Sequence, residues 1–152
     1  IIIISGHEEN PSLQQRADGF NKEISISYPQ INNLGIRYAY DDDWVAEKIT
    51  DEILDKYPNL KGIYITGSGV LGVCKSLQKA NKIKDIKIIA NDFINDNIQL
   101  LSNGTINFLI GQDAYTQGYQ SIMLLFHKLF DNKNPDSKFA YTDIVIKNRF
   151  NI

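Results

Sequence analysis

Cysteine and histidine are scarce in this sequence, and their scarcity excludes several kinds of site. The 152 residues include one cysteine, Cys74, and two histidines, His7 and His127. A single cysteine cannot form an internal disulfide, and no zinc-site spacing is present. No arrangement of serine, histidine and aspartate suggests a nucleophilic catalyst. We therefore expect a protein that is not an enzyme and uses no cofactor or metal, with Cys74 as a buried, inert thiol.

Long apolar runs and a strong excess of one charge are also missing. The opening run Ile1–Ile4 is too short for a signal peptide, and no stretch approaches the roughly 20 apolar residues of a membrane-spanning helix. Sixteen basic and eighteen acidic residues give a net charge of −2, so no basic field could hold nucleic acid over a whole face. Lysines cluster at Lys82, Lys84 and Lys87, but Asp85 lies among them. We interpret this cluster as a solvated helix end and strand edge.

What the sequence does contain is a regular alternation of apolar patterns. These patterns predict strands at 1–5, 34–40, 60–66, 86–90, 106–110 and 140–146. They predict helices at 13–24, 44–57, 70–80, 94–102 and 115–130, with Ser12 as the N-cap of the first. Strands that alternate with helices need crossover connections, so the order predicts an α/β three-layer sandwich with a mainly parallel sheet. In such a fold, ligands bind at the carboxyl ends of the strands.

One glycine motif needs interpretation. Residues 67–72 read GSGVLG, which follows a predicted strand and opens a predicted helix. This G-x-G-x-x-G pattern is compatible with a dinucleotide site, and Asp92 lies near the offset of the acid that would hold the ribose. Glycines at a strand-to-helix turn also serve close packing and positive φ angles alone. From this stretch, a dinucleotide site, a purely structural turn and a site for another small ligand all stay open.

The other strand ends favour a sugar. The predicted ligand-binding residues there are Arg16, Trp44, Ser68, Asp92 and Gln112. Sugar hydroxyls both donate and accept hydrogen bonds, so planar guanidinium, carboxylate and amide groups pair with them well. The C–H face of a sugar packs on an aromatic ring. Four of them also have a structural alternative: Arg16 as a surface ion pair, Asp92 as a helix cap, Trp44 as a core or lobe-interface aromatic and Gln112 as a hinge residue.

Four segments together resemble one superfamily, that of LacI-type regulators and periplasmic sugar-binding proteins. They are ISGHEENPSLQQRADGF, KGIYITGSGVLGVCKSLQKA, IKIIANDF and FLIGQDAYTQGYQSIMLLFHKLF. The resemblance implies a periplasmic-binding-protein-like type I lobe, in which Arg16 and Asp92 contact the ligand. It further implies that residues 1–111 form the core of the C-terminal lobe. Residues 112–134 would then cross toward the other lobe, and 139–152 would return. One departure is Gly67–Ser68, where many members carry Asn-Asp.

The resemblance implies the ligand-sensing domain of a LacI-type transcriptional regulator. A small sugar or sugar derivative would close two lobes and so control DNA binding through an upstream helix-turn-helix domain. The chain, which opens without an initiator methionine, would be a fragment of a cytoplasmic homodimer that binds no membrane. The alternative is the extracytoplasmic sugar-binding receptor of an ABC transporter or sensor, and a less favoured one is a fragment of an NAD-dependent oxidoreductase.

The last predicted helix carries an apolar face that the missing lobe would cover. Its members are Ile122, Met123, Leu125, Phe126 and Leu129. Without that lobe, we expect the face to pack on the sheet or on a second copy of the chain.

Overall fold

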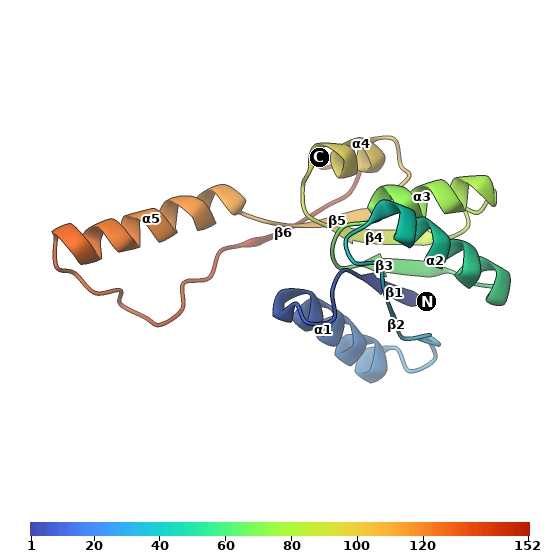
Figure 1. Cartoon of the computed structure of the whole chain (residues 1–152), viewed down its shortest axis with the longest axis horizontal. Helices are drawn as coiled ribbons and strands as arrows, with labels where there is room; N and C mark the ends of the chain where they lie inside the picture. Colours follow the sequence, from blue (N-terminus) through green and yellow to red (C-terminus); the bar gives the residue numbers. More distant parts are fainter.

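A computed structural model describes all residues, 1–152, as six strands and five helices in alternation along most of the chain. The strands are β1 (Ile2–Ser5), β2 (Ile36–Tyr38), β3 (Gly62–Ile65), β4 (Lys87–Asn91), β5 (Phe108–Gln112) and β6 (Ile144–Lys147). The helices are α1 (Pro11–Ser27), α2 (Asp43–Lys56), α3 (Val70–Lys79), α4 (Asn95–Ser102) and α5 (Ala114–Phe130). Figure 1 shows a compact body with α5 extending away from it.

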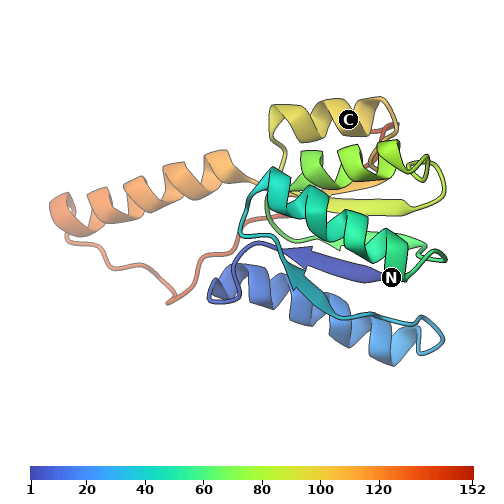
Figure 2. The same cartoon turned by 45° about the vertical axis from the view of Figure 1, so that its right-hand side comes forward.

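The strands form one sheet in the order β2-β1-β3-β4-β5-β6. Every neighbouring pair is parallel except β5 and β6, which are antiparallel. Helix α1 covers one face of the sheet, and α2, α3 and α4 cover the other (Figure 2). The predicted α/β three-layer fold with a mainly parallel sheet is therefore confirmed. Since the connections between parallel strands are crossovers, the carboxyl ends of β1, β3, β4 and β5 share one edge.

Burial on both faces explains the β-branched sequence of β1. Ile2 and Ile4 belong to the main core, which they form with residues of α2, α3 and α4. Ile3 points to the opposite face and packs with Ala17 of α1. Cys74 lies in the main core, where burial raises the pKa of its thiol to about 12. The prediction of a buried, inert thiol is confirmed.

Two local predictions were wrong at the ends of elements. Helix α1 is capped by Asn10, whose Oδ1 accepts hydrogen bonds from the amides of Ser12 and Leu13, and not by Ser12. Pro11 fits the first helical position because that position needs no N–H donor. Strand β6 begins at Ile144 and not at residue 140, because its partner on β5 is Gln112. Beyond Gln112 the chain turns into α5 and leaves residues 140–143 without a strand to pair with.

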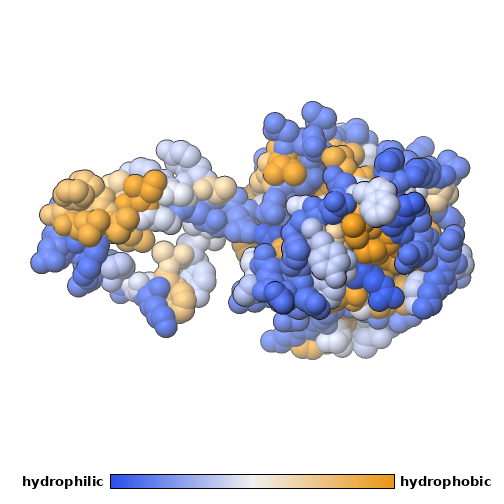
Figure 3. Space-filling model, viewed as in Figure 1, coloured by the Kyte–Doolittle hydropathy of each residue, from blue (hydrophilic) through white to orange (hydrophobic).

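Helix α5 has no buried residue. Its apolar face is exposed at Ile122, Leu125, Phe126 and Leu129, and Figure 3 shows hydrophobic atoms gathered along it. The face does not cover the sheet, so that half of the sequence-based expectation is wrong; packing on a second copy stays a prediction. No helix in the structure has the length and apolar character needed to cross a membrane.

The tightest contact between helices joins α2 to α3. Gly72 of α3 lies against the start of α2, and a Cβ atom there would lie 1.8 Å from the carbonyl oxygen of Asp43. The amide of Gly72 also donates a hydrogen bond to Asp43 Oδ1 at 3.2 Å. The last glycine of GSGVLG thus allows two helices to approach each other.

We predict that Gly72→Ala destabilises the fold, because backbone atoms of α2 block the added methyl group. Overpacking of this kind costs about 1–3 kcal/mol. The matched control is Gly19→Ala in α1, where an added Cβ meets nothing within 4 Å. That change should stabilise by roughly 0.4–1 kcal/mol, because alanine loses less backbone entropy on folding. Urea unfolding of both variants measures the two effects, and a neutral Gly72→Ala would contradict the close approach.

An ion-pair cluster adds to the same helix contact. Glu47 of α2 is almost enclosed, and its carboxylate accepts hydrogen bonds from Lys75, at 2.8 Å, and from Lys79 of α3. These hydrogen bonds lower the pKa of Glu47 from 4.5 to about 2. A carboxylate with a lowered folded-state pKa stabilises the fold above its unfolded-state pKa and loses that effect as the pH falls toward the folded-state value.

We predict that Glu47→Gln is less stable than the parent chain at neutral pH. The difference in unfolding free energy should stay constant down to about pH 5 and shrink between about 4.5 and 2, since the parent carboxylate becomes protonated there. Thermal unfolding followed by circular dichroism across this pH range measures it. Glu23→Gln, which removes an exposed carboxylate outside any ion pair, is the control and should change stability little. A pH-independent difference for Glu47→Gln would refute the prediction.

Candidate functional site

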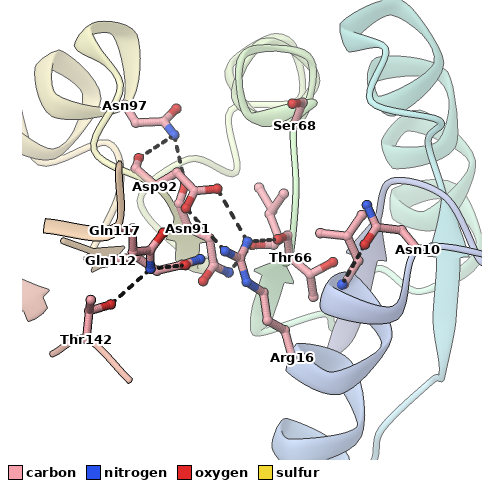
Figure 4. A network of polar contacts seen from close by, with 12 residues as sticks. Asn10, Arg16, Thr66, Ser68, Asn91, Asp92, Asn97, Gln112, Gln117 and Thr142 are labelled. Carbon is pink, nitrogen blue, oxygen red and sulfur yellow. Dashed lines mark hydrogen bonds and ion pairs between the residues drawn. The ribbon is translucent and has the colours of Figure 1, made fainter. Parts of the chain in front are cut away.

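The candidate site lies at the edge where the parallel strands end, and Arg16 is at its centre. Arg16 is in the second turn of α1, directly after β1, so its side chain reaches across the ends of the neighbouring strands (Figure 4). Its Nη1 donates to the carbonyl oxygen of Thr66 at 2.6 Å and to Asp92 Oδ2 at 3.3 Å. Its Nη2 donates to Asp92 Oδ1 at 3.2 Å. The guanidinium therefore grips the Asp92 carboxylate with both nitrogens, an arrangement that fixes both groups.

The backbone of Asp92 is held in an uncommon conformation. Its φ angle is +70°, in the left-handed region that few non-glycine residues adopt. The buried amide of Asn97 in α4 donates to the carbonyl oxygens of Asn91, at 3.0 Å, and Asp92, at 3.1 Å. The amide nitrogen of Asp92 donates to the carbonyl oxygen of Ile110 at 2.8 Å. The Asp92 carboxylate thus points from a fixed turn and does not cap α4, whose N-cap is Ile94.

Asn91, next to Asp92, has a structural role. Its side chain is buried and donates to the carbonyl oxygen of Ile65 at 2.9 Å and to the hydroxyl of Tyr64 at 3.2 Å. These bonds join the end of β4 to β3. Asn91 therefore supports the base of the site.

Gln112 and Arg16 line the same hollow, which measures about 530 Å³ and is also lined by Asn91 and Tyr141. Gln112 Oε1 accepts a hydrogen bond from Gln117 of α5 at 2.9 Å. Gln117 also donates to Thr142 Oγ1 at 3.0 Å and so connects the start of α5 to the returning chain. Gln112 thus lies at the candidate site and is bonded to α5; its roles as a ligand contact and as a hinge residue both stay predictions.

Ser68 lines a second hollow of about 330 Å³, which it shares with Asp92. Three further carboxylates line this hollow, those of Asp41, Asp43 and Asp96. The amide of Ser68 donates to Asp41 Oδ1 at 2.9 Å. Asp92 belongs to this hollow and its ion-pair partner Arg16 to the larger one, so the pair lies where the two meet.

Trp44 is the predicted site residue that the structure does not bring to either hollow. It lies in the first turn of α2 with 65% of its surface exposed. Lys48 is close to its ring, with Nζ 5.7 Å from the ring centre. It is not a core aromatic, and its role as a stacking wall stays a prediction.

Two amides of the glycine turn are already bonded to carboxylates and are not free for a pyrophosphate. The amides of Ser68 and Gly72 already donate to the carboxylates of Asp41 and Asp43. Gly69 is the N-cap of α3 at φ +95°, and a Cβ at Gly67 would lie 2.7 Å from Asp41 Oδ1. Steric needs account for these glycines, and neighbouring carboxylates would repel phosphate. The geometry favours the structural interpretation of GSGVLG over the dinucleotide one.

Two contributors to the site were missed in the sequence. Asn97 is a buried amide within α4, and no local pattern distinguishes it from an exposed asparagine. Tyr141 comes from a segment without regular structure that returns past β5. Asp113, the residue after Gln112, caps α5: it accepts a hydrogen bond from the amide of Thr116 at 3.0 Å. The bonds from Thr116 lower the pKa of Asp113.

Solved sugar-binding structures share this architecture. An ABC transporter solute-binding protein from Agrobacterium vitis, bound with alpha-D-tagatopyranose, has a TM-score of 0.90 and 22% identity; the match covers 99% of this chain and 50% of that one. AraP, an arabinose-binding protein from Geobacillus stearothermophilus, has a TM-score of 0.85 and 25% identity, over 99% and 54%. A solute-binding protein from Actinobacillus succinogenes 130z with bound D-allose has a TM-score of 0.89 and 22% identity, over 98% and 53%. This chain therefore spans about half the length of these proteins.

A comparison with curated proteins gives no match. A family model does match, described as a periplasmic binding protein domain, and it covers residues 1–133. Since that range includes most of the chain and all of the strand-end edge, the chain belongs to the periplasmic binding protein family.

Proposed function

We propose that this chain is one lobe of a solute-binding receptor and that a neutral monosaccharide binds at its strand-end edge. The observation that carries the proposal is the Arg16–Asp92 ion pair beside Gln112, at the junction of two open hollows. The guanidinium offers donors, the carboxylate acceptors and the carboxamide both. Such a set matches sugar hydroxyls, which donate and accept at once.

The charges at this edge favour an uncharged ligand. Arg16 is already paired with Asp92, and three more carboxylates line the neighbouring hollow. A sugar phosphate would bring negative charge toward these acids without a free cation among the lining residues of that hollow to balance it. A neutral sugar meets no such repulsion.

The related structures support the receptor more than the regulator. The neighbours described above are solute-binding and sugar-binding proteins, and their names include tagatose, arabinose and allose. This favours the alternative hypothesis of an extracytoplasmic receptor over the LacI-type regulator. The upstream DNA-binding domain, the homodimer and the cytoplasmic location belong to the less favoured hypothesis, the LacI-type regulator. The gene sequence ahead of residue 1 separates the two, because a receptor needs a signal peptide there and a regulator needs a helix-turn-helix domain.

The open form of the site supports binding between two lobes. Asp92 is about half exposed, and both hollows open to solvent, so a ligand resting there would keep one face uncovered. A second lobe that closes over that face would gain contacts only in the closed state, and the sugar would stabilise closure. A transporter or sensor could then recognise the closed form.

We predict that Arg16→Lys weakens sugar binding by about tenfold or more. Lysine keeps the charge but cannot grip Asp92 and a hydroxyl with a planar fork, and hydrogen bonds to charged groups contribute roughly 1.5–3 kcal/mol. The measurement is an NMR titration of the chain with D-tagatose, L-arabinose and D-allose, with glucose 6-phosphate as the charged comparison. The control is Arg37→Lys on β2, an exposed arginine away from both hollows.

The neutral sugars should shift the amide signals of Asp92 and Gln112, and the phosphate should not shift them. Sugar-induced shifts confined to another part of the chain would contradict the proposed site. Equal affinity of the Arg16→Lys and parent chains would exclude Arg16 from it.

We further predict that the chain alone binds its sugar weakly, near the millimolar range, which corresponds to about 4 kcal/mol. One wall supplies only part of the contacts of a closed cleft. Isothermal titration calorimetry of the 152-residue chain checks this. Submicromolar affinity for any monosaccharide would show that the second lobe is not needed.

A further inference from the structure

A hollow of about 500 Å³ lies at the opposite edge of the sheet, where β4 and β5 begin and β6 ends. Three separate segments line it: residues 83, 84, 86 and 87, residues 103–108, and residues 148–150. Asp85, between the two lysines in sequence, is not among the lining residues. They meet there because β6 runs antiparallel to β5 and returns the C-terminus to this edge, beside α4 (Figure 1). Because the segments are far apart in sequence, their combination is visible only in the folded chain.

The charged residues that line this hollow are all basic. They are Lys84, Lys87 and Arg149, and no aspartate or glutamate lines it. The four ion pairs of the structure include none of the three. Their side chains also donate no hydrogen bond to a carbonyl group, so none of the three caps the C-terminal end of a helix. The Arg149 guanidinium stacks on Phe150, 4.6 Å from the ring centre, which limits its freedom.

Three asparagine side chains add hydrogen-bond donors to the hollow. In each, Oδ1 accepts a hydrogen bond from a backbone amide, which fixes the orientation of the side-chain amide. The backbone amide of Thr105 donates to Asn103 at 3.0 Å, that of Ile88 to Asn107 at 2.8 Å and that of Phe150 to Asn148 at 2.9 Å. With the oxygen occupied, each NH2 group points elsewhere and donates to no protein acceptor. The hollow therefore has free donors of two kinds, cationic groups and amides, and no carboxylate lines it.

We propose that this hollow binds a phosphate-type oxyanion, and that it prefers a ligand with more than one phosphate group. Three unpaired cations and three oriented amides suit an acceptor-rich, multiply charged ligand. A single cation at a surface would be screened by salt, whereas several cations and amides that line one hollow can contact the same ligand. The hollow has room for more than one phosphate group. The site is separate from the sugar site, at the other end of the strands, and does not depend on it.

The test is an NMR titration of the 152-residue chain with pyrophosphate and with orthophosphate, at constant ionic strength set by sodium chloride. The signals to follow are the side-chain amides of Asn103, Asn107 and Asn148. The test variant is Lys84→Gln with Arg149→Gln, two exposed positions whose replacement should leave the fold intact. The matched control is Lys22→Gln with Arg37→Gln, which removes the same charges elsewhere on the surface.

We expect saturable shifts of these amides, with pyrophosphate tighter than orthophosphate. Loss of two charged donors should weaken pyrophosphate binding at least about tenfold, and the control should stay within about twofold of the parent chain. Shifts that do not saturate, or that sodium chloride alone reproduces, would overturn the proposal. So would equal affinity of the test and control variants. Addition of D-tagatose at the same time should leave these signals unchanged.

Discussion

The candidate site depends on one contact, the Arg16 guanidinium set between the carbonyl group of Thr66 and the carboxylate of Asp92. It joins α1 to the ends of β3 and β4, so three elements far apart in sequence take fixed positions at one edge. The contact is possible because the sheet is parallel and buried on both faces. Parallel strands bring their carboxyl ends together, and the helix that follows β1 must return along the sheet with its first turns at that same edge. Asn97 then fixes the turn from which Asp92 points.

Acidic side chains of the chain itself occupy several helix N-termini at this edge. Asp42 caps α2, Asp113 caps α5, and Asp41 and Asp43 accept the amides of the glycine turn before α3. A helix N-terminus otherwise attracts phosphate, because its amides are free and its dipole is positive. Here carboxylates use such donors at α2 and α5 and take two amides of the glycine turn, although α3 and α4 have no side-chain cap. The same residues therefore weaken the case for a dinucleotide at GSGVLG and strengthen the case for a neutral sugar.

Most of the fold could be predicted because it depends on patterns that repeat within each segment. The β-branched run of β1 and the helical spacing of apolar residues in α2 indicate buried elements whatever surrounds them. The errors came where a partner decides the outcome. Strand β6 starts at Ile144 because β5 ends at Gln112, and the sequence around residue 140 carries no sign of that. In the candidate site, Asp92 and Gln112 were predicted from their positions at strand ends and Arg16 mostly from the family resemblance, and the structure places all three at the same edge. Trp44 lines neither hollow, although its neighbour Asp43 lines one of them, because successive residues of a helix point in different directions. The role of Asn97 in fixing the turn at Asp92 could not be predicted, because it depends on the burial of the side chain and not on the residue type.

The two edges of the sheet thus differ in the kind of ligand that they can accept. At the strand-end edge, acids cap α2 and α5, and the other polar groups there are a mixture of donors and acceptors. At the opposite edge, helices end, and basic residues are favoured there by the negative ends of their dipoles. This dipole preference alone would explain lysines near the last turns of the helices, and it does not require that they bind a ligand. It does not account for the arrival of Arg149 and Asn148, which β6 carries to the same hollow from the far end of the chain. Because three segments far apart in sequence bring these cations and amide donors into one hollow that no carboxylate lines, that combination is the stronger reason to expect an anion at this edge.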